Sequence, residues 1–183
     1  MKLINSDLDI FKKNLKIVTK TISRQKKIEI NYVNNNSSIK GNIINIQEPP
    51  EDLSIKNISQ VRGEADSIGT QVRYHNPKIH RKYIRSKSTG SKIFNYLEKS
   101  RCEALGSKAF KGISKNITSK FKNEYMNSKF NPETLKIEDF FYLFSFIHFT
   151  NKKLDKELKQ LEKFYNDKLG KKINPYFNEL TKN

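Results

Sequence analysis

Hydrophobic residues recur every three or four positions in the first 22 residues, which is the spacing of one face of an α-helix. The stripe consists of Leu8, Phe11, Leu15, Val18 and Ile22. Ser6 precedes it as a candidate N-cap, and Asp9 follows three residues later as an acidic capping partner. The pattern predicts an amphipathic helix whose apolar face packs against another part of the molecule.

The hydrophobic period changes to two in the next segment. Apolar and polar residues alternate over 28–32, a turn-forming cluster fills 34–38, and a second apolar run covers 39–46. Two short strands separated by turn residues predict a β-hairpin. Pro49 and Pro50 then interrupt both kinds of regular structure, so this connector is the best candidate boundary within the chain.

The rest of the chain returns to helical spacing. Apolar stripes predict helices over 55–72, 93–105, 110–121 and 154–165. Gly106 is well placed as the C-terminal stop of the second of these helices. The segment from Phe140 to Phe149 is apolar on nearly every side, so this helix is either central to the core or covered by a partner.

These patterns predict a mainly α fold of the α+β kind. We expect amphipathic helices packed as a bundle, with a small β-hairpin near the N-terminus. The length fits one domain over 1–183, with the helix and hairpin in 1–48 and the helical part in 53–183.

The charge of the chain is strongly positive. It has 36 Lys and Arg against 19 Asp and Glu, which gives a net charge of +17. Such a balance is typical of nucleic-acid binding, because lysines neutralise phosphates. Only 6 of these residues are arginine, however, and Lys, Asn and Ile are the residues that AT-rich codons supply. A solvated lysine-rich surface and an acidic protein partner are therefore equally consistent with the charge.

Candidate catalytic and metal-binding motifs are incomplete. Cys102 is the one cysteine, which excludes an internal disulfide and a CxxC zinc site, and we predict a small buried side chain. His75 and His80 are five positions apart with Pro77 between them, unlike an i,i+4 metal pair. Residues 86–92 lack the first glycine of a phosphate loop. The residues therefore predict no catalytic centre, metal site or cofactor on this chain.

No targeting or membrane segment is visible. The first residues lack an apolar secretory core, and the longest apolar run is roughly half a membrane span. We expect a cytoplasmic protein without a membrane partner.

Three motifs follow one another between residues 61 and 117. An Arg-Gly-x-x-Asp stretch begins at Arg62, and a His-Asn-Pro-x-x-His stretch begins at His75. A Phe-Asn-x-x-Glu-x-x-Arg-x-Glu-Ala-Leu-Gly stretch then ends at Gly106. This series resembles the amino-terminal region of the CobT subunit of aerobic, ATP-dependent cobaltochelatase, with a looser similarity over most of the chain.

The resemblance implies an accessory or scaffold subunit of the complex that inserts cobalt into hydrogenobyrinic acid a,c-diamide in vitamin B12 biosynthesis. It implies two partners, a CobS-like AAA+ ATPase and a CobN-like large subunit that holds the corrin. ATP, magnesium and cobalt would then be used by the complex, with no cofactor on this chain. A basic nucleic-acid-binding module is the alternative function.

CobT proteins also have an acidic middle segment and a carboxy-terminal von Willebrand A domain, and these 183 residues contain neither. A truncated gene, a fragment and a split subunit are the three explanations. An acidic segment is a physically suitable partner for a basic chain.

The matched polar residues are candidate site residues: Arg62, Asp66, Arg73, His75, His80, Glu98, Arg101 and Glu103. Arg62 and Asp66 lie one helical turn apart and are expected to pair with Glu98, Arg101 or Glu103 on a neighbouring helix. The residues form either a polar network that holds the fold or a contact site for a partner. For His75 and His80, the structural interpretation is capping and turn geometry.

Overall fold

The structure is a computed structural model that describes residues 2–84, 88–125 and 134–151, with the short stretches 159–160, 163–164, 166–170 and 175. In this part of the chain the elements are α1 (Lys2–Ser23), β1 (Glu29–Val33), β2 (Ser38–Lys40), β3 (Ile43–Gln47), α2 (Ile55–Tyr74), α3 (Pro77–Tyr83), α4 (Thr89–Ala109), α5 (Lys111–Tyr125), α6 (Ile137–Thr150) and a π-helical turn (Asn166–Gly170). The predicted mainly helical fold class is confirmed. The helix predicted over 154–165 falls mostly outside the described residues.

Helix α1 is amphipathic as predicted, but it differs from the prediction in where it begins and in one residue of its apolar stripe. It begins at Lys2, so Ser6 lies inside the helix and does not cap it. Leu15 and Ile22 are buried, whereas Val18 is 48 % exposed and Thr19 is buried instead. The crossing with α2 decides this rotation, because the backbone of Gly69 lies directly against Ile22 and Thr19.

The sheet has three strands in the order β1-β3-β2. The predicted hairpin between the two apolar runs is wrong in its pairing, because β1 pairs with β3 in parallel. The hairpin forms instead within the second run, between β2 and β3, where Gly41 takes a left-handed φ of +57°. Parallel register places Ile30 beside Ile44, so that the buried isoleucines of both strands cover the same core.

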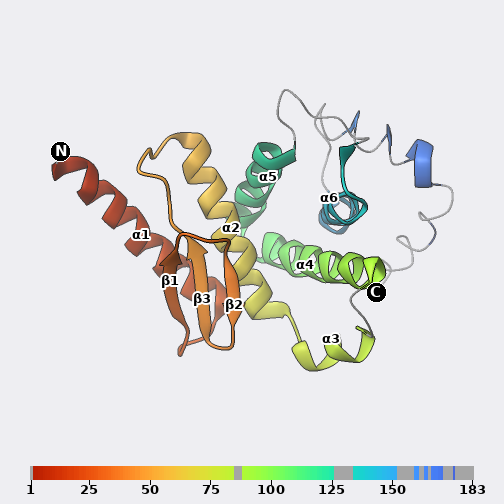
Figure 1. Cartoon of the computed structure of the whole chain (residues 1–183), viewed down its shortest axis with the longest axis horizontal. Coiled ribbons are helices and arrows are strands. Elements are labelled where there is room, and N and C mark those ends of the chain that lie inside the picture. Colours follow the sequence, from red (N-terminus) through yellow and green to blue (C-terminus); the bar gives the residue numbers. More distant parts are fainter. Residues whose placement is uncertain are drawn as a thin grey trace.

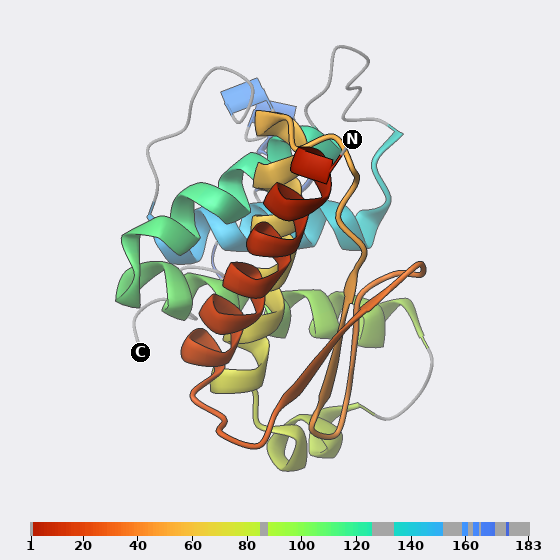
Figure 2. The same ribbon diagram turned by 90° about the vertical axis from the view of Figure 1, so that its left-hand side faces the viewer.

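Helix α2 runs through the middle of the molecule, with α1 and the sheet on one side and α4 and α5 on the other (Figures 1 and 2). The core of the described residues consists of two hydrophobic clusters. The first cluster joins α1, the sheet and α2 and consists of Leu15, Ile28, Ile30, Ile44, Ile46, Val61, Ala65 and Ile68. The second joins the end of α1 to α5 and α6 and consists of Ile22, Ile113, Ile117, Phe121, Phe140, Tyr142, Leu143, Phe144 and Phe146. Helix α2 supplies Val61, Ala65 and Ile68 to the first cluster and none of the residues of the second, and it also packs on α4 and α5.

Helix α6 is part of the second cluster, and α4 covers it. Its burial confirms the first of the two alternatives for this apolar segment, a helix central to the core. Helix α4 continues past Gly106 to Ala109, so the predicted stop at that glycine is wrong. Gly106 instead allows close packing on α2, since a Cβ there would lie 2.1 Å from Thr70 Cγ2. Within the described residues, no helix combines the length and the apolar character that a bilayer crossing requires.

Candidate functional site

The three motifs meet where α2, α3 and α4 are joined. The first motif lies in α2, the second forms the turn from α2 into α3, and the third lies in α4. Asn76 caps α3, since its Oδ1 accepts hydrogen bonds from the N–H groups of Lys78 and Ile79. His75 is the C-cap of α2 and its N–H donates to the carbonyl of Gln71, whereas His80 lies inside α3.

Glu103 lies at the centre of a buried polar cluster. It is fully buried, and its Oε1 accepts hydrogen bonds from the hydroxyls of Ser67 and Tyr142, each at 2.5 Å. The ammonium of Lys99 lies 4.8 Å from the centre of the Tyr142 ring. The cluster therefore joins α2, α4 and α6 through one carboxylate.

A buried ion pair joins α2 to α5 beside this cluster. Lys120 is 2 % exposed, and its Nζ lies 3.0 Å from Glu64 Oε2. Burial lowers the pKa of Lys120, but the surrounding carboxylates of Glu64, Glu103 and Glu124 raise it above its usual value overall. The pair is therefore charged and serves to hold the two helices together.

Asp66 faces a cleft between α1, α2 and α5. The cleft has a volume of about 280 Å³ and is lined mainly by apolar side chains, including Val18, Ile113 and Phe110. Asp66 is 3 % exposed, and its Oδ2 accepts a hydrogen bond of 2.8 Å from Asn116 Nδ2. Burial raises the pKa of Asp66 to about 6, against the opposite effects of Asn116 and Arg62.

Glu98 contacts the polar side chains of Arg101 and His75 near the α2–α3 turn. Arg101 Nε donates to its Oε2 at 2.7 Å, and Arg101 Nη2 donates to its Oε1 at 2.8 Å and to the carbonyl of Tyr74 at 3.0 Å. His75 Nδ1 lies 2.9 Å from Oε1. Although burial raises the pKa of Glu98, the hydrogen bonds from Arg101 and His75 lower it to about 2. Glu98 is therefore ionised at neutral pH.

Cys102 lies one helical turn after Glu98. The predicted burial is confirmed, since the side chain has no exposed surface. Its thiol donates to Glu98 Oε1 over 3.6 Å. Burial, together with the negative charge of Glu98, raises the pKa of Cys102 to about 12, so that the protonated thiol is the resting form. Sequence spacing gave no sign that Cys102 and His75 lie side by side, because they belong to different helices.

His80 and Arg73 also make contacts within the fold. His80 Nε2 lies 2.8 Å from Asn95 Oδ1, and its ring stacks on Phe94. Arg73 Nη1 donates to the carbonyl of Ile22 at 3.2 Å, which ties the end of α1 to α2.

The structure pairs the predicted residues differently from the expectation. Arg62 lies over the ring of Phe11, and Asp66 pairs with Asn116, whereas Glu98, Arg101 and Glu103 have the other partners given above. The eight residues thus form several small sets. Their contacts agree with a network that holds the fold, and contact with a partner stays a prediction.

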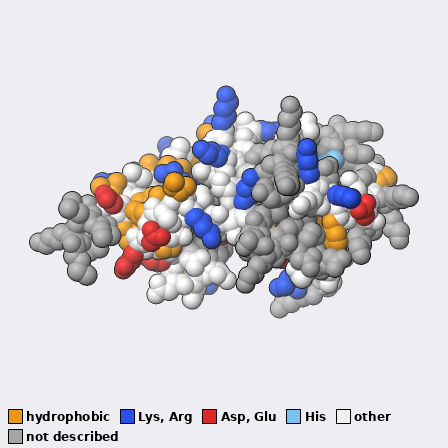
Figure 3. All heavy atoms as spheres, turned by 90° about the horizontal axis from the view of Figure 1, so that it is seen from above, with side chains coloured by type: hydrophobic (Ala, Val, Ile, Leu, Met, Phe, Trp, Pro, Cys, Tyr) orange, Lys and Arg blue, Asp and Glu red, His pale blue; other side chains and the backbone are white. Residues whose placement is uncertain are grey.

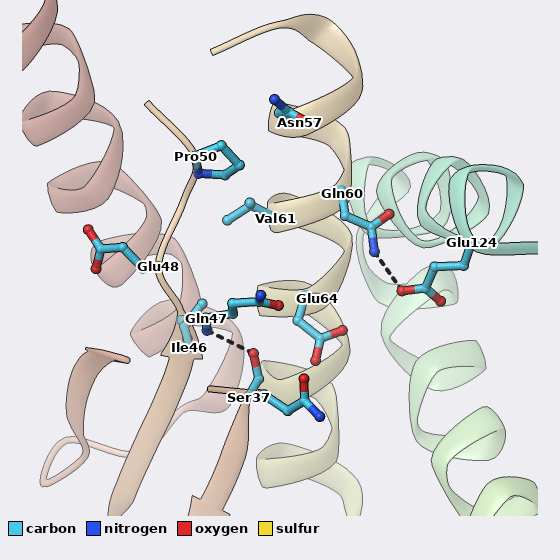
Figure 4. A pocket seen from close by; sticks show the side chains of 11 residues that line it. Ser37, Ile46, Gln47, Glu48, Pro50, Asn57, Gln60, Val61, Glu64 and Glu124 are labelled. Atoms are coloured by element: carbon cyan, nitrogen blue, oxygen red, sulfur yellow. Dashed lines mark hydrogen bonds between the residues drawn. The ribbon is translucent and has the colours of Figure 1, made fainter. Parts of the chain in front are cut away.

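A second cleft, of about 310 Å³, opens between the end of β3, α2 and α5 (Figure 4). Its lining includes the carboxylates of Glu48, Glu64 and Glu124. Gln60 Nε2 donates to Glu124 Oε1 at 2.5 Å across it. Sequence reasoning missed this acidic cleft in a basic chain, because its residues come from four separate segments without a shared motif.

The fold and the site define a mainly helical domain in which polar pairs join the helices at the motif-bearing turn. The family model described as cobalamin biosynthesis protein CobT matches residues 5–182. This chain belongs to the CobT family, which confirms the resemblance carried by the three motifs, and its role is in cobalamin biosynthesis. No solved structure shows a significant match to it.

Proposed function

We propose that this chain is an accessory subunit of the ATP-dependent cobaltochelatase that inserts cobalt into hydrogenobyrinic acid a,c-diamide. The match to the CobT family over residues 5–182 is the observation that carries the proposal. The chain acts in a cytoplasmic complex through contacts with other subunits, a CobS-like AAA+ ATPase and a CobN-like large subunit. ATP turnover and the insertion step belong to those partners.

The contacts of the motif residues support a scaffold role. Glu103, Lys120 and Asp66 are each more than nine-tenths buried and hold helices together. A carboxylate that is enclosed in this way fixes the relative positions of the helices and is poorly placed to meet a substrate. The rigid helices in turn present an outer surface to the partners.

The outer face of α1 is the surface that we assign to a partner. Ile10, Ile17 and Val18 are 56 %, 55 % and 48 % exposed, and lysines, including Lys13 and Lys20, lie exposed on the same helix. Hydrophobic side chains gather at the end of the molecule that carries α1 (Figure 3). Asp7 and Asp9 are exposed near the start of the same helix, so the lysine-rich rim lies along its second half, and this surface suits a partner that has an apolar groove with an acidic edge.

Co-purification tests the proposal. We expect the tagged chain to retain the CobS-like or the CobN-like subunit of the same cell, both at low salt and at physiological salt. Failure to retain either subunit under both conditions would contradict the chelatase assignment.

Substitutions on α1 test the assigned surface. The double variant Ile10→Gln, Ile17→Gln removes the two most exposed apolar side chains of the stripe and should weaken partner binding about tenfold or more. Ile55→Gln is the matched control, because Ile55 is 88 % exposed at the start of α2. Equal affinity of both variants would place the contact surface elsewhere.

A further inference from the structure

Three metal-binding types of side chain converge between the end of α2 and the middle of α4. His75 Nδ1 lies 2.9 Å from Glu98 Oε1, and Cys102 Sγ lies 3.6 Å from the same oxygen. The three ligand atoms all lie within 4.8 Å of one another. In a tetrahedral site with bonds of about 2.0–2.3 Å, ligand atoms are about 3.3–3.8 Å apart, so His75 Nδ1 and Glu98 Oε1 would move slightly apart while the widest pair would close by about 1 Å.

The backbone holds these residues in place. Glu98 and Cys102 are four residues apart in α4 and therefore share one face of the helix. His75 is fixed between the end of α2 and the capped start of α3. Its ring also meets the ring of His80 edge-on, with 4.7 Å between the centroids. His80 is itself held by Asn95. The orientation of the His75 ring is therefore supported by His80 on one side and by Glu98 on the other.

We propose that His75, Glu98 and Cys102 bind a divalent transition-metal ion of borderline softness, such as Zn²⁺ or Co²⁺, and leave a fourth position for an exchangeable ligand. Imidazole and thiolate select such ions over Mg²⁺ and Ca²⁺, which prefer oxygen ligands. The thiolate and the carboxylate together balance the two charges of the ion. This property goes beyond the proposed scaffold role, and it also departs from the expectation, drawn from the sequence, of no metal on this chain.

The exposure of the three side chains shows how an ion could reach them. Cys102 is fully buried, but the side chains of His75 and Glu98 are 29 % and 18 % exposed, so the ion enters from their side. On binding, the thiol proton of Cys102 leaves to solvent and the lone pair of His75 Nδ1 turns to the metal, with the ring proton on Nε2.

Arg101 occupies the cation position beside Glu98 and must give way in part. Its Nη2, which also lies 3.8 Å from Cys102 Sγ, releases Glu98 Oε1 and the sulfur to the metal and keeps the carbonyl of Tyr74, while its Nε keeps Glu98 Oε2. The Arg101 side chain is 44 % exposed, which leaves it room to shift. After the shift it orients the carboxylate from outside, as second-layer groups do in metal sites.

Titration of the purified full chain with Co²⁺, in a thiol-free reductant, tests the site by absorption spectroscopy. Cys102 is the one cysteine of the chain, so a thiolate-to-cobalt charge-transfer band reports this residue alone. We expect a band that saturates at one equivalent of Co²⁺ and disappears when Zn²⁺ is added. Absence of a saturable band would overturn the proposal.

Variants assign the ligands. Cys102→Ala should abolish the band, and His75→Gln should weaken Co²⁺ binding at least tenfold, with circular dichroism as the check on folding. His148→Gln is the matched control, because His148 lies in α6 and stacks on Phe144. If His75→Gln does not fold, Glu98→Gln takes its place with the same expected loss. If the variants fold and the band is unaltered, the proposal is overturned. This result does not depend on the co-purification experiment, which tests the scaffold role.

Discussion

At the scale of single residues, the polar groups of the motifs are stabilised by partners from other helices. Glu103 has no exposed surface, yet its Oε1 accepts hydrogen bonds from two hydroxyl groups, one in α2 and one in α6. Removing one partner of such a buried group leaves the other without compensation for its lost hydration, so single substitutions are informative here.

We expect Tyr142→Phe to lower the free energy of unfolding by about 1.5–3 kcal/mol. The substitution removes the hydrogen bond that the Tyr142 hydroxyl donates to the Glu103 carboxyl group, and it keeps the packing of the ring. Urea denaturation followed by circular dichroism measures the change. Tyr83→Phe is the matched control at a side chain that is 68 % exposed, where the change should stay within about 0.5 kcal/mol. Equal stability of the two variants would show that the Glu103 hydrogen bond contributes nothing.

Asp66 provides a prediction of pH dependence. Its pKa is raised from 3.8 to about 6 in the folded protein, so between these values the folded state binds more protons than the unfolded state. The contribution of Asp66 to stability is therefore present near pH 4 and lost as the pH rises through 6. Relative to Asp66→Asn, the wild-type free energy of unfolding should fall by up to about 3 kcal/mol between pH 4 and pH 7. Parallel pH profiles of the two proteins, measured by urea denaturation, would contradict the raised pKa.

At the scale of elements, close helix crossings depend on glycine. A Cβ on Gly63 would lie 2.6 Å from Lys120 Cβ and 2.7 Å from the carbonyl oxygen of Asn116, so α2 and α5 are nearly in backbone contact there. This crossing also brings Glu64 to Lys120 and Asp66 to Asn116. These two of the polar contacts between α2 and α5 therefore depend on the same short distance.

We expect Gly63→Ala to lower the free energy of unfolding by about 1–3 kcal/mol, because the added methyl group forces the two backbones apart. Thermal and urea denaturation measure the loss. Gly112→Ala places the same methyl group in α5 with nothing within 4 Å, so its stability should be equal to that of the wild type or up to about 1 kcal/mol higher. A Gly63→Ala variant as stable as Gly112→Ala would contradict the tight crossing.

At the scale of the whole molecule, the net charge of +17 is the dominant property. On the face shown in Figure 3, Lys and Arg side chains are spread over the surface and do not gather in one patch. Dispersed lysines attract polyanions at long range but do not read bases, for which paired arginine contacts are typical. Encounter with an acidic protein surface and weak, sequence-independent binding of nucleic acid both stay predictions from this charge.

Gel retardation of duplex DNA tests this interpretation. We expect binding that weakens steeply as salt rises and that needs more than about 1 μM protein at physiological salt, whatever the DNA sequence. Binding below that concentration at physiological salt would favour the nucleic-acid module over the scaffold subunit.

The amino-acid sequence by itself determined the helices, the family and the burial of Cys102. Hydrophobic spacing is a local property, and it marks the segments of α1 and α6 from which buried residues are drawn, although Val18 of the α1 stripe stays exposed. The three motifs likewise lie on short continuous segments, so the order of their residues was enough to carry the resemblance.

Only the tertiary structure decided which segments meet. Alternating strands fit a parallel or an antiparallel neighbour equally well, so the β1–β3 pairing followed from the shared core with α1 and α2. The role of Gly106 depended on Thr70 of another helix. The meeting of His75 with Cys102 depended on the packing of α4 against the end of α2. Such contacts form between residues far apart in the chain, and no local pattern specifies them, because they arise from the way whole faces of helices pack together.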